Sequence, residues 1–309
     1  MQVMEIDYSM SLEFSVPVIN HFCILRCIPV SRGSQTVTER KLIVTPQIKL
    51  VSNRDIFGNI SYRGQLIEPH MHFGFEATAT VHVDYEKGSR EGCIPLYKYG
   101  TELTFATEKM RGFLKSTFAG TDLEEAVIEK KIPRHKVIDF AERLCSSLFN
   151  YMEYEPGVTT VKTTAGQAFE SRKGVCQDFT HIYCSMCRIA GVAARYVCGA
   201  SRGEGSTHAW AEVFVPDEIF LQSNGTQIQG RWFGIDPTRN RRCNNDYVIL
   251  AVGRDYNDCQ VDRGIFRGNA DQTQTVFVRT RAVELPDYTA PKGMKAQSVM
   301  FSPIQPHEQ

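Results

Sequence analysis

The feature that most constrains the fold is a helix-forming stretch, about Val175 to Ala190, that is apolar almost all round. A helix without a broad polar face must be covered on most sides, so it belongs in the interior of a domain. Strand-like runs follow it, at residues 192–198, 209–215, 232–236, 247–252 and 275–279. A helix followed by consecutive strands is the order of an α+β domain, which we expect over residues 156–285.

The N-terminal residues 1–90 predict β structure. From Phe73 to Asp84, odd positions hold Phe, Phe, Ala, Ala, Val and Val, while even positions hold Gly or polar residues. This period of two predicts a strand with one face on a core and one in water. Shorter runs, separated by turn residues, lie at 22–28, 42–45, 48–51 and 60–66. Short strands at this spacing predict a small antiparallel sandwich, an all-β N-terminal domain.

A helical segment is expected to connect these two parts, over residues 91–155. Between His135 and Asn150, apolar residues recur at the spacing of one helix face. The sequence Thr121-Asp-Leu-Glu-Glu125 has the hydroxyl and the acids of a helix start. Residues 286–309, with their prolines, predict a loose C-terminal tail.

The overall composition excludes several classes of function. The 309 residues carry a formal net charge of zero, so we expect neither nucleic acid nor an anionic membrane as a partner. No apolar stretch is long enough to span a bilayer. The N-terminus lacks the basic start and apolar core of a signal peptide, which predicts a cytoplasmic protein. Its ten cysteines are then expected to be free thiols.

Cys176 is the candidate nucleophile. It lies in Lys173-Gly-Val-Cys-Gln-Asp178, where the buried helix is expected to begin. The partial positive charge and free N–H groups of a helix N-terminus favour a thiolate, and the amide of Cys176 itself could face a developing oxyanion. On local sequence alone, a core thiol beneath a helix cap is an equally good interpretation.

A histidine and a carboxylate follow in the order that a thiol triad requires. His208 opens the strand-like run His208–Val215, at a place where a cleft wall is expected. Asp236 ends the next run, and Pro237 stops the ladder there, so the carboxylate can meet His208 across one neighbouring strand. The alternatives are a half-exposed sheet histidine and a plain Asp-Pro-Thr turn. Glu212 is expected to be a partner or a solvated residue rather than the base.

Other clusters of reactive residues are weaker. Cys184 and Cys187 have metal-like spacing, but they lie inside the apolar helix and have no second pair. His70 and His72 are expected on the surface of a loop or strand. No phosphate loop or dinucleotide fingerprint is present. A group of arginines just past Asp236 could bind a carboxylate or phosphate, although a solvated loop is the preferred interpretation: Arg239, Arg241 and Arg242.

At these residues the chain resembles the bacterial transglutaminase-like family, also described as cysteine proteases. The resemblance covers about residues 150–285, and residues before 90, including Asp55-Ile-Phe-Gly-Asn59, are similar to the β-rich N-terminal domain that accompanies this core. The matching blocks, in order, are Thr159–Ala165, Gly174-Val-Cys-Gln-Asp178, Ala194–Val197, His208-Ala-Trp-Ala-Glu212, Asp236-Pro-Thr238, Gly253–Tyr256 and Gly264–Gly268.

This resemblance implies a papain-like α+β core with Cys176 as nucleophile, His208 as base and Asp236 as the group that orients the base. It implies attack on the amide carbonyl of a peptide or protein, a thioester intermediate, and no cofactor or metal. The expected function is amide-bond hydrolysis of the peptidase or amidase type. The alternatives are acyl transfer from glutamine to an amine, and a non-catalytic binding module. For the side-chain oxyanion donor, Tyr154, Thr160 and Gln177 all stay open.

Overall fold

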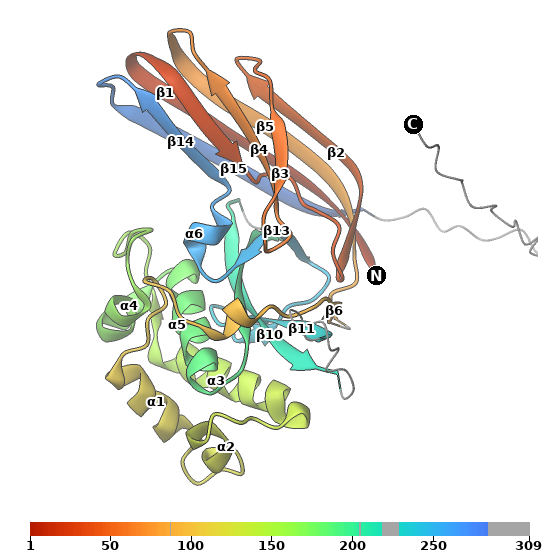
Figure 1. Cartoon of the computed structure of the whole chain (residues 1–309), viewed down its shortest axis with the longest axis vertical. Helices are drawn as coiled ribbons and strands as arrows, with labels where there is room; N and C mark the ends of the chain where they lie inside the picture. The colour runs from red at the N-terminus through yellow and green to blue at the C-terminus, as the bar shows by residue number, and fades with distance from the viewer. Residues whose placement is uncertain (87, 204, 218–228, 284–309) are drawn as a thin grey trace, which may run out of the picture.

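The computed structural model describes residues 1–86, 88–203, 205–217 and 229–283, and the expected tail 286–309 lies outside them. The first unit is a bent, seven-stranded antiparallel sheet (Figure 1). Its order is β2-β5-β1-β4-β3, with β14 and β15 also paired to β1. The strands are β1 (Gln2–Leu25), β2 (Gln35–Thr45), β3 (Val51–Arg54), β4 (Ile60–Leu66), β5 (His70–Val83), β14 (Asp262–Arg267) and β15 (Gln272–Val283).

The long central strand β1 organises this unit. Its alternate residues Met4, Ile6, Tyr8 and Met10 are buried, as the period of a half-buried strand requires. Its first half pairs with β5 and β15, and its second half pairs with β4 and β14. The ladder shifts register between Glu13 and Val18, which is where β1 passes from one set of partners to the other.

The pairing of β14 and β15 differs from the sequence expectation, which placed residues up to 285 in the catalytic core. Val3 pairs with Val283 and Phe14 with Gln272, so the last described strand runs beside the first (Figure 1). Asp7 accepts a hydrogen bond from Arg279 across this pair at 2.6 Å. Strands β14 and β15 therefore complete the N-terminal sheet, and the two units are joined by segments at both ends of the core.

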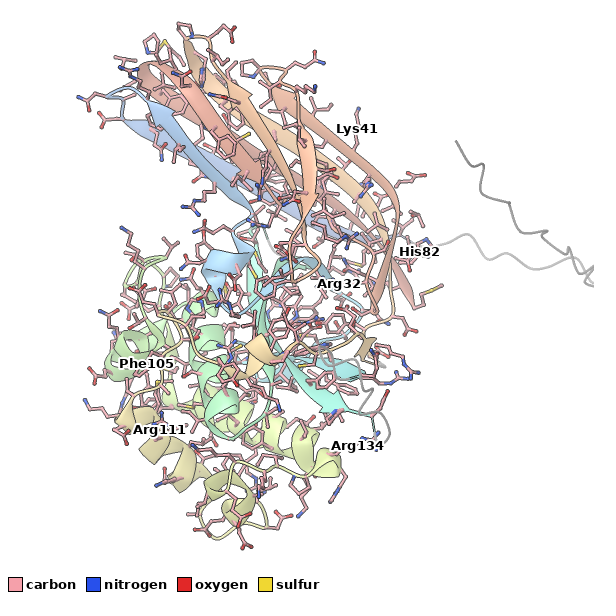
Figure 2. All side chains as sticks on the ribbon, in the orientation of Figure 1. Arg32, Lys41, His82, Phe105, Arg111 and Arg134 are labelled. Carbon is pink, nitrogen blue, oxygen red and sulfur yellow. The ribbon has the colours of Figure 1, made fainter. Side chains whose placement is uncertain are left out.

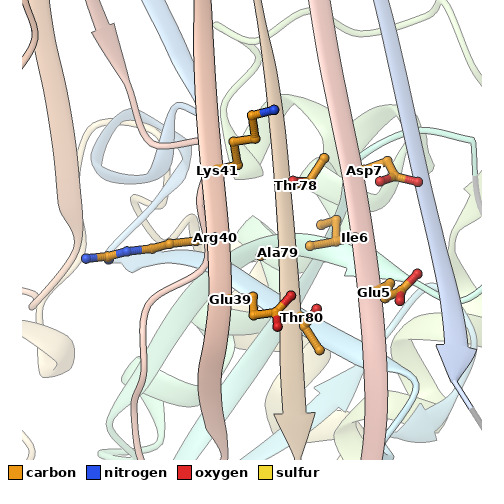
Figure 3. A pocket seen from close by; sticks show the side chains of 9 residues that line it. All are labelled: Glu5, Ile6, Asp7, Glu39, Arg40, Lys41, Thr78, Ala79 and Thr80. Carbon is orange, nitrogen blue, oxygen red and sulfur yellow. The ribbon is translucent and has the colours of Figure 1, made fainter.

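The outer face of this sheet is polar. Glu5, Asp7, Thr78 and Thr80 project from neighbouring strands around a shallow hollow of about 400 Å³, together with Lys41 (Figure 3). Figure 2 likewise shows Lys41 pointing away from the protein. Charged side chains that alternate with buried ones are typical of a solvated sheet face.

The second unit is a helical layer on a six-stranded sheet of order β12-β11-β10-β9-β13, with β6 paired to β11. Helix α5 packs against β9 and β10. The strands are β6 (Ser89–Arg90), β9 (Ala194–Ser201), β10 (His208–Pro216), β11 (Gly230–Asp236), β12 (Arg241–Arg242) and β13 (Tyr247–Gly253). The helices are α1 (Glu108–Phe118), α2 (Glu124–Ile128), α3 (Val137–Tyr151), α4 (Ala165–Ser171), α5 (Cys176–Ile189) and α6 (Tyr256–Cys259).

Helix α5 is the buried helix that the sequence predicted. Ile182, Cys184, Met186 and Cys187 are fully buried, so its apolar character is satisfied on every side. It ends before Gly191, whose φ of +80° is a left-handed conformation that favours glycine. The described residues include no helix long and apolar enough to cross a bilayer.

Two short pieces complete the fold. Strands β7 (Glu153–Tyr154) and β8 (Lys173–Gly174) form a small parallel pair, and β8 lies just before α5.

The predicted helix start at Thr121 lies close to the observed one, because α2 begins at Glu124 and Thr121 Oγ1 accepts a hydrogen bond from the amide of Leu123. The predicted strand at 48–51 is shifted, since β3 begins only at Val51.

Candidate active site

Cys176 is the first residue of α5, and the local sequence builds the turn that presents it. The Asp178 carboxylate accepts hydrogen bonds from the amide of Val175 at 2.8 Å and from Thr159 Oγ1 at 2.7 Å, which caps the helix. A Cβ on Gly174 would lie 2.7 Å from Asp178, so only glycine fits beside the cap. Of the ten cysteines, Cys176 is partly exposed and the other nine are buried.

His208 and Asp236 meet at one edge of the core sheet. His208 is the first residue of β10, and Asp236 is the last residue of β11. These strands are antiparallel neighbours, so the start of one lies beside the end of the other. His208 Nε2 lies 2.8 Å from Asp236 Oδ2, and the two side chains are almost completely buried. The expected meeting across neighbouring strands is therefore observed.

The thiol of Cys176 joins this pair. Burial is the largest influence on the pKa of His208 and lowers it, but hydrogen bonds with Asp236 and with Cys176 outweigh burial and raise the pKa to about 9. Since Asp236 occupies Nε2, Nδ1 is the ring nitrogen left for the thiol. The fold thus brings together three residues that lie on α5, β10 and β11.

Asp236 is held by groups whose role the sequence did not reveal. Its Oδ1 accepts hydrogen bonds from the amides of Thr238 at 3.0 Å and Arg239 at 3.2 Å. Its Oδ2 accepts a hydrogen bond from the hydroxyl of Tyr247 at 2.7 Å, beside the one from His208. Four donors fix the carboxylate in place, which keeps it from turning away from the histidine.

Tyr247 is a residue of the candidate site that the sequence did not single out. It starts β13, and the tyrosine was visible only as the beginning of a predicted strand. Its ring packs against Trp210 and lies near His208. Its hydroxyl accepts hydrogen bonds from Arg239 Nη1 at 3.3 Å and Arg241 Nε at 3.1 Å. These two arginines therefore support the site instead of forming only a solvated loop.

Glu212 is fully buried in β10. The sequence had left it open whether this residue is a partner of the site or a solvated side chain. It accepts a hydrogen bond from the hydroxyl of Tyr85 at 2.5 Å and is ion-paired with Arg195. Tyr85 also accepts a hydrogen bond from Trp210 Nε1 at 2.8 Å. Glu212 is thus a structural partner beneath the site.

The two histidines of the β unit that the sequence placed on a surface, His70 and His72, differ in burial. His72 is partly exposed and lies 2.7 Å from Glu13, as expected for a strand surface. His70 is buried and stacks on His21, with 3.2 Å between their ring nitrogens, so the surface expectation for His70 is wrong. The rings of Phe14 and His21, both on β1, pack against His70, and the sequence of its own strand does not reveal these partners. In the described part of the chain, no group of histidines, cysteines and acids has a metal-binding arrangement, at Cys184 and Cys187 or elsewhere.

Of the three possible oxyanion donors, Tyr154 lies close enough to Cys176 for the thiol to affect its pKa. It lies on β7, is 52% exposed, and its pKa is raised by burial and by the nearby Cys176. Thr160 uses its amide and hydroxyl within its own turn, in hydrogen bonds with Thr163 and Lys162. Gln177 is partly buried in the first turn of α5.

Comparison with known proteins agrees with this fold. Residues 126–237 match the model of the transglutaminase-like superfamily, and residues 4–82 match that of the bacterial transglutaminase-like N-terminal region. An uncharacterized protein of Mycobacterium tuberculosis is 28% identical over 247 residues, or 72% of this chain and 74% of that protein. An uncharacterized protein of Mycobacterium leprae is 26% identical over 292 residues, or 89% and 97% of the two chains.

A solved structure also matches nearly the whole chain. It is a protein of Cytophaga hutchinsonii described as a "putative cysteine protease", with a TM-score of 0.67, 21% identity and 92% coverage of both chains. At this identity the likeness shows the fold. By the two family matches, residues 126–237 are a transglutaminase-like core and residues 4–82 are a bacterial transglutaminase-like N-terminal region.

Proposed function

We propose that this protein is a thiol-dependent amide-bond hydrolase of the peptidase or amidase type, with Cys176 as nucleophile, His208 as acid and base, and Asp236 as the residue that orients His208. One observation carries the proposal. His208 Nε2 lies 2.8 Å from Asp236, and hydrogen bonds with both Asp236 and Cys176 raise the pKa of His208. This is the arrangement that activates a thiol and keeps a proton ready for the leaving group.

In the first half-reaction, the sulfur of Cys176 attacks the amide carbonyl carbon and a C–S bond forms. His208, which takes up the thiol proton, is protonated at neutral pH because its pKa is about 9. It donates that proton to the leaving nitrogen as the C–N bond breaks, and a thioester remains on Cys176. Asp236 holds the ring in position and stabilises its positive charge.

The oxyanion formed in this step needs donors near the thiol. The amide of Cys176 is in the first turn of α5, where N–H groups have no partner within the helix. We assign the second donor to the hydroxyl of Tyr154, because its pKa responds to Cys176 and half of the residue is accessible. Such a donor contributes roughly 3 kcal/mol to the stability of a transition state.

In the second half-reaction, His208 takes a proton from water, and the water oxygen attacks the thioester carbon. The C–S bond then breaks, which releases the acid and restores the Cys176 thiolate beside the protonated His208. A primary amine in place of water would give a new amide, which is the transfer reaction. The covalent first half is common to both outcomes, so the same triad serves either. A non-catalytic module is the less favoured alternative, because it would have no need of four donors on the buried Asp236.

The test compares wild-type protein with Cys176→Ala on a panel of peptides, with and without a primary amine, by mass spectrometry of the products. We expect turnover to disappear in the variant while folding is retained. Cys93→Ala, at a buried cysteine outside the site, is the control and should keep its activity. Free acid as the product would support hydrolysis, and an amine adduct would support transfer.

Alkylation with iodoacetamide gives an independent measure of the thiol. Selective labelling of Cys176 alone is not diagnostic, because it is also the most exposed of the ten cysteines. The diagnostic quantity is the labelling rate near pH 6, which should fall in His208→Asn without a change in exposure. Equal rates at pH 6 in both proteins would overturn the assignment of His208. The cytoplasmic location stays a prediction, which fractionation of the source cells would test.

A further inference from the structure

A groove of about 1030 Å³ lies at the junction of the two units. One side is formed by β14 and β15 of the N-terminal sheet, and the other by α6 and the segment 161–162. Figure 1 shows α6 between the sheet of the β unit and the helices of the core. Clefts between units are common places for substrates to bind.

The groove lies between two segments that are each hydrogen-bonded to α5, the helix whose first residue is Cys176. On one wall, Val161 and Lys162 follow Thr159, whose hydroxyl is bonded to Asp178 in the first turn of α5. On the other wall, the amide of Tyr256 donates a hydrogen bond to His181 of α5 at 3.1 Å. Both walls are therefore attached to α5, and a peptide whose amide reaches Cys176 can extend into the groove.

Asp262 gives the groove its chemical character. It is partly buried at the start of β14, and burial raises its pKa above the ordinary value. Its carboxylate accepts a hydrogen bond from Gln274 at 2.8 Å, and no ion pair is recorded for it within the described residues. The buried Tyr8 and Cys198 also lie close to it, since its charge contributes to raising the pKa of both.

The groups around Asp262 provide a further hydrogen-bond acceptor but no cation that pairs with its carboxylate within the described residues. Tyr256 lines the groove near Asp262, and its hydroxyl has no recorded hydrogen bond within the described residues. The cations that line the groove, Lys162 and Arg263, are solvent-exposed and form no recorded ion pair with Asp262 in the described part of the chain. A partly desolvated carboxylate without a cation is costly, and a bound cation would relieve that cost.

We propose that this groove binds the substrate on one side of the reacting amide, and that Asp262 recognises a lysine or arginine side chain of the substrate. An ammonium or guanidinium group carries only donors, which suits a carboxylate and a tyrosine oxygen. The aromatic rings of Tyr256 and Phe266 offer apolar surface for the methylene stem. This inference rests on the proposed function, because it assigns the substrate class of the same site.

The first experiment measures kcat/KM of the wild-type protein for peptides that carry one lysine, moved stepwise along an otherwise neutral sequence, against glutamine at the same position. At one position we expect lysine to be preferred roughly ten- to hundredfold, the usual contribution of a hydrogen bond to a charged group. Equal turnover of lysine and glutamine peptides at every position would overturn the proposal without any variant.

The second experiment compares Asp262→Asn, which keeps the shape and a partner for Gln274, with Asp271→Asn in the nearby turn as the matched control. Asp262→Asn should lose the lysine preference, so that its kcat/KM values for the lysine and glutamine peptides converge, while circular dichroism reports whether the chain has folded. Asp271→Asn should behave like the wild type. A lysine preference that survives in Asp262→Asn would assign it to another residue and overturn the role of Asp262.

Binding separates this inference from the proposed function. Fluorescence anisotropy with labelled peptides and the Cys176→Ala protein needs no catalysis. Tighter binding of the lysine peptide, together with no turnover in the wild type, would support the groove and contradict the proposed hydrolase. Turnover without any lysine preference in rate or binding would support the proposed hydrolase and contradict the role of the groove.

Discussion

Replacing Asp236 with asparagine tests the electrostatic reasoning most directly. The side chain keeps its size, but the negative charge beside His208 is lost. The pKa of His208 is about 9, against an ordinary value of about 6.5, although burial lowers it. The difference corresponds to about 3 kcal/mol in favour of the protonated ring. Without the carboxylate, we expect burial to dominate and the pKa to fall well below 9.

Two measurements report this change. Iodoacetamide should label Cys176 at pH 6 at least about tenfold more slowly in Asp236→Asn, because a neutral histidine no longer stabilises the thiolate. The value of kcat/KM should fall by about 10² to 10⁴, the scale of losing the orienting carboxylate in a triad.

The same substitution has a thermodynamic signature. A histidine whose pKa is raised on folding contributes stability that is fully present below its unfolded pKa of about 6.5 and is lost as the pH rises through about 9. The free energy of unfolding of the wild type should therefore fall by up to about 3 kcal/mol over this window. In Asp236→Asn this part of the fall should vanish. Asp258→Asn, at a carboxylate paired with Arg254, is the control.

Unchanged labelling at pH 6 in Asp236→Asn, with an unchanged stability profile, would refute the reasoning. It would mean that the Asp236 carboxylate does not raise the pKa of His208. A variant that fails to fold would be recognised by circular dichroism. In that case Asp236→Glu, which keeps the charge but moves it, should retain the alkaline part of the stability profile and lose activity.

Three further predictions follow from neighbouring contacts. Tyr247→Phe removes one hydrogen bond to Asp236, and we expect kcat/KM to fall roughly three- to tenfold, with a shifted pH profile, on the scale of about 1 kcal/mol. Tyr154→Phe should lower kcat by about 10² or less and leave the alkylation rate at pH 6 unchanged, because an oxyanion donor acts only in the transition state. Glu212→Ala should reduce the free energy of unfolding by about 3 kcal/mol in a urea titration, since it leaves Arg195 with one carboxylate fewer in the core.

Much of the core could be predicted because its signals are local. The apolar run that became α5 can only be satisfied in an interior, and the helix was observed at Cys176–Ile189, within a residue of the expectation. Helix α3, observed at Val137–Tyr151, had a clear apolar face. Strands β10, β11 and β13 lie where the strand-like runs predicted them. In each of these segments, the pattern of apolar residues is enough to predict which side chains are buried.

Other parts depend on partners far away in the chain. The sequence of residues 272–283 does not predict that they pair with β1. Alternation of apolar and polar residues indicates which face of a strand is buried, but not which strand lies beside it. Helix α1 lies inside the helical segment expected at 91–155, although its bounds were not given, whereas helix α4 was not predicted, since short helices gain most of their stability from packing. The burial of His70 likewise depends on the stacked ring of His21.

The candidate site shows the same division. The sequence alone determined the order of Cys176, His208 and Asp236 and the type of element that carries each, because helix starts and strand ends are marked by local residues. Only the tertiary structure decided that Nε2 of His208 faces Asp236, that Tyr247 shares the same carboxylate oxygen, and that a groove with Asp262 opens at the junction of the two units. Distances between side chains arise from how separate elements pack, and packing is a property of the whole chain rather than of any segment.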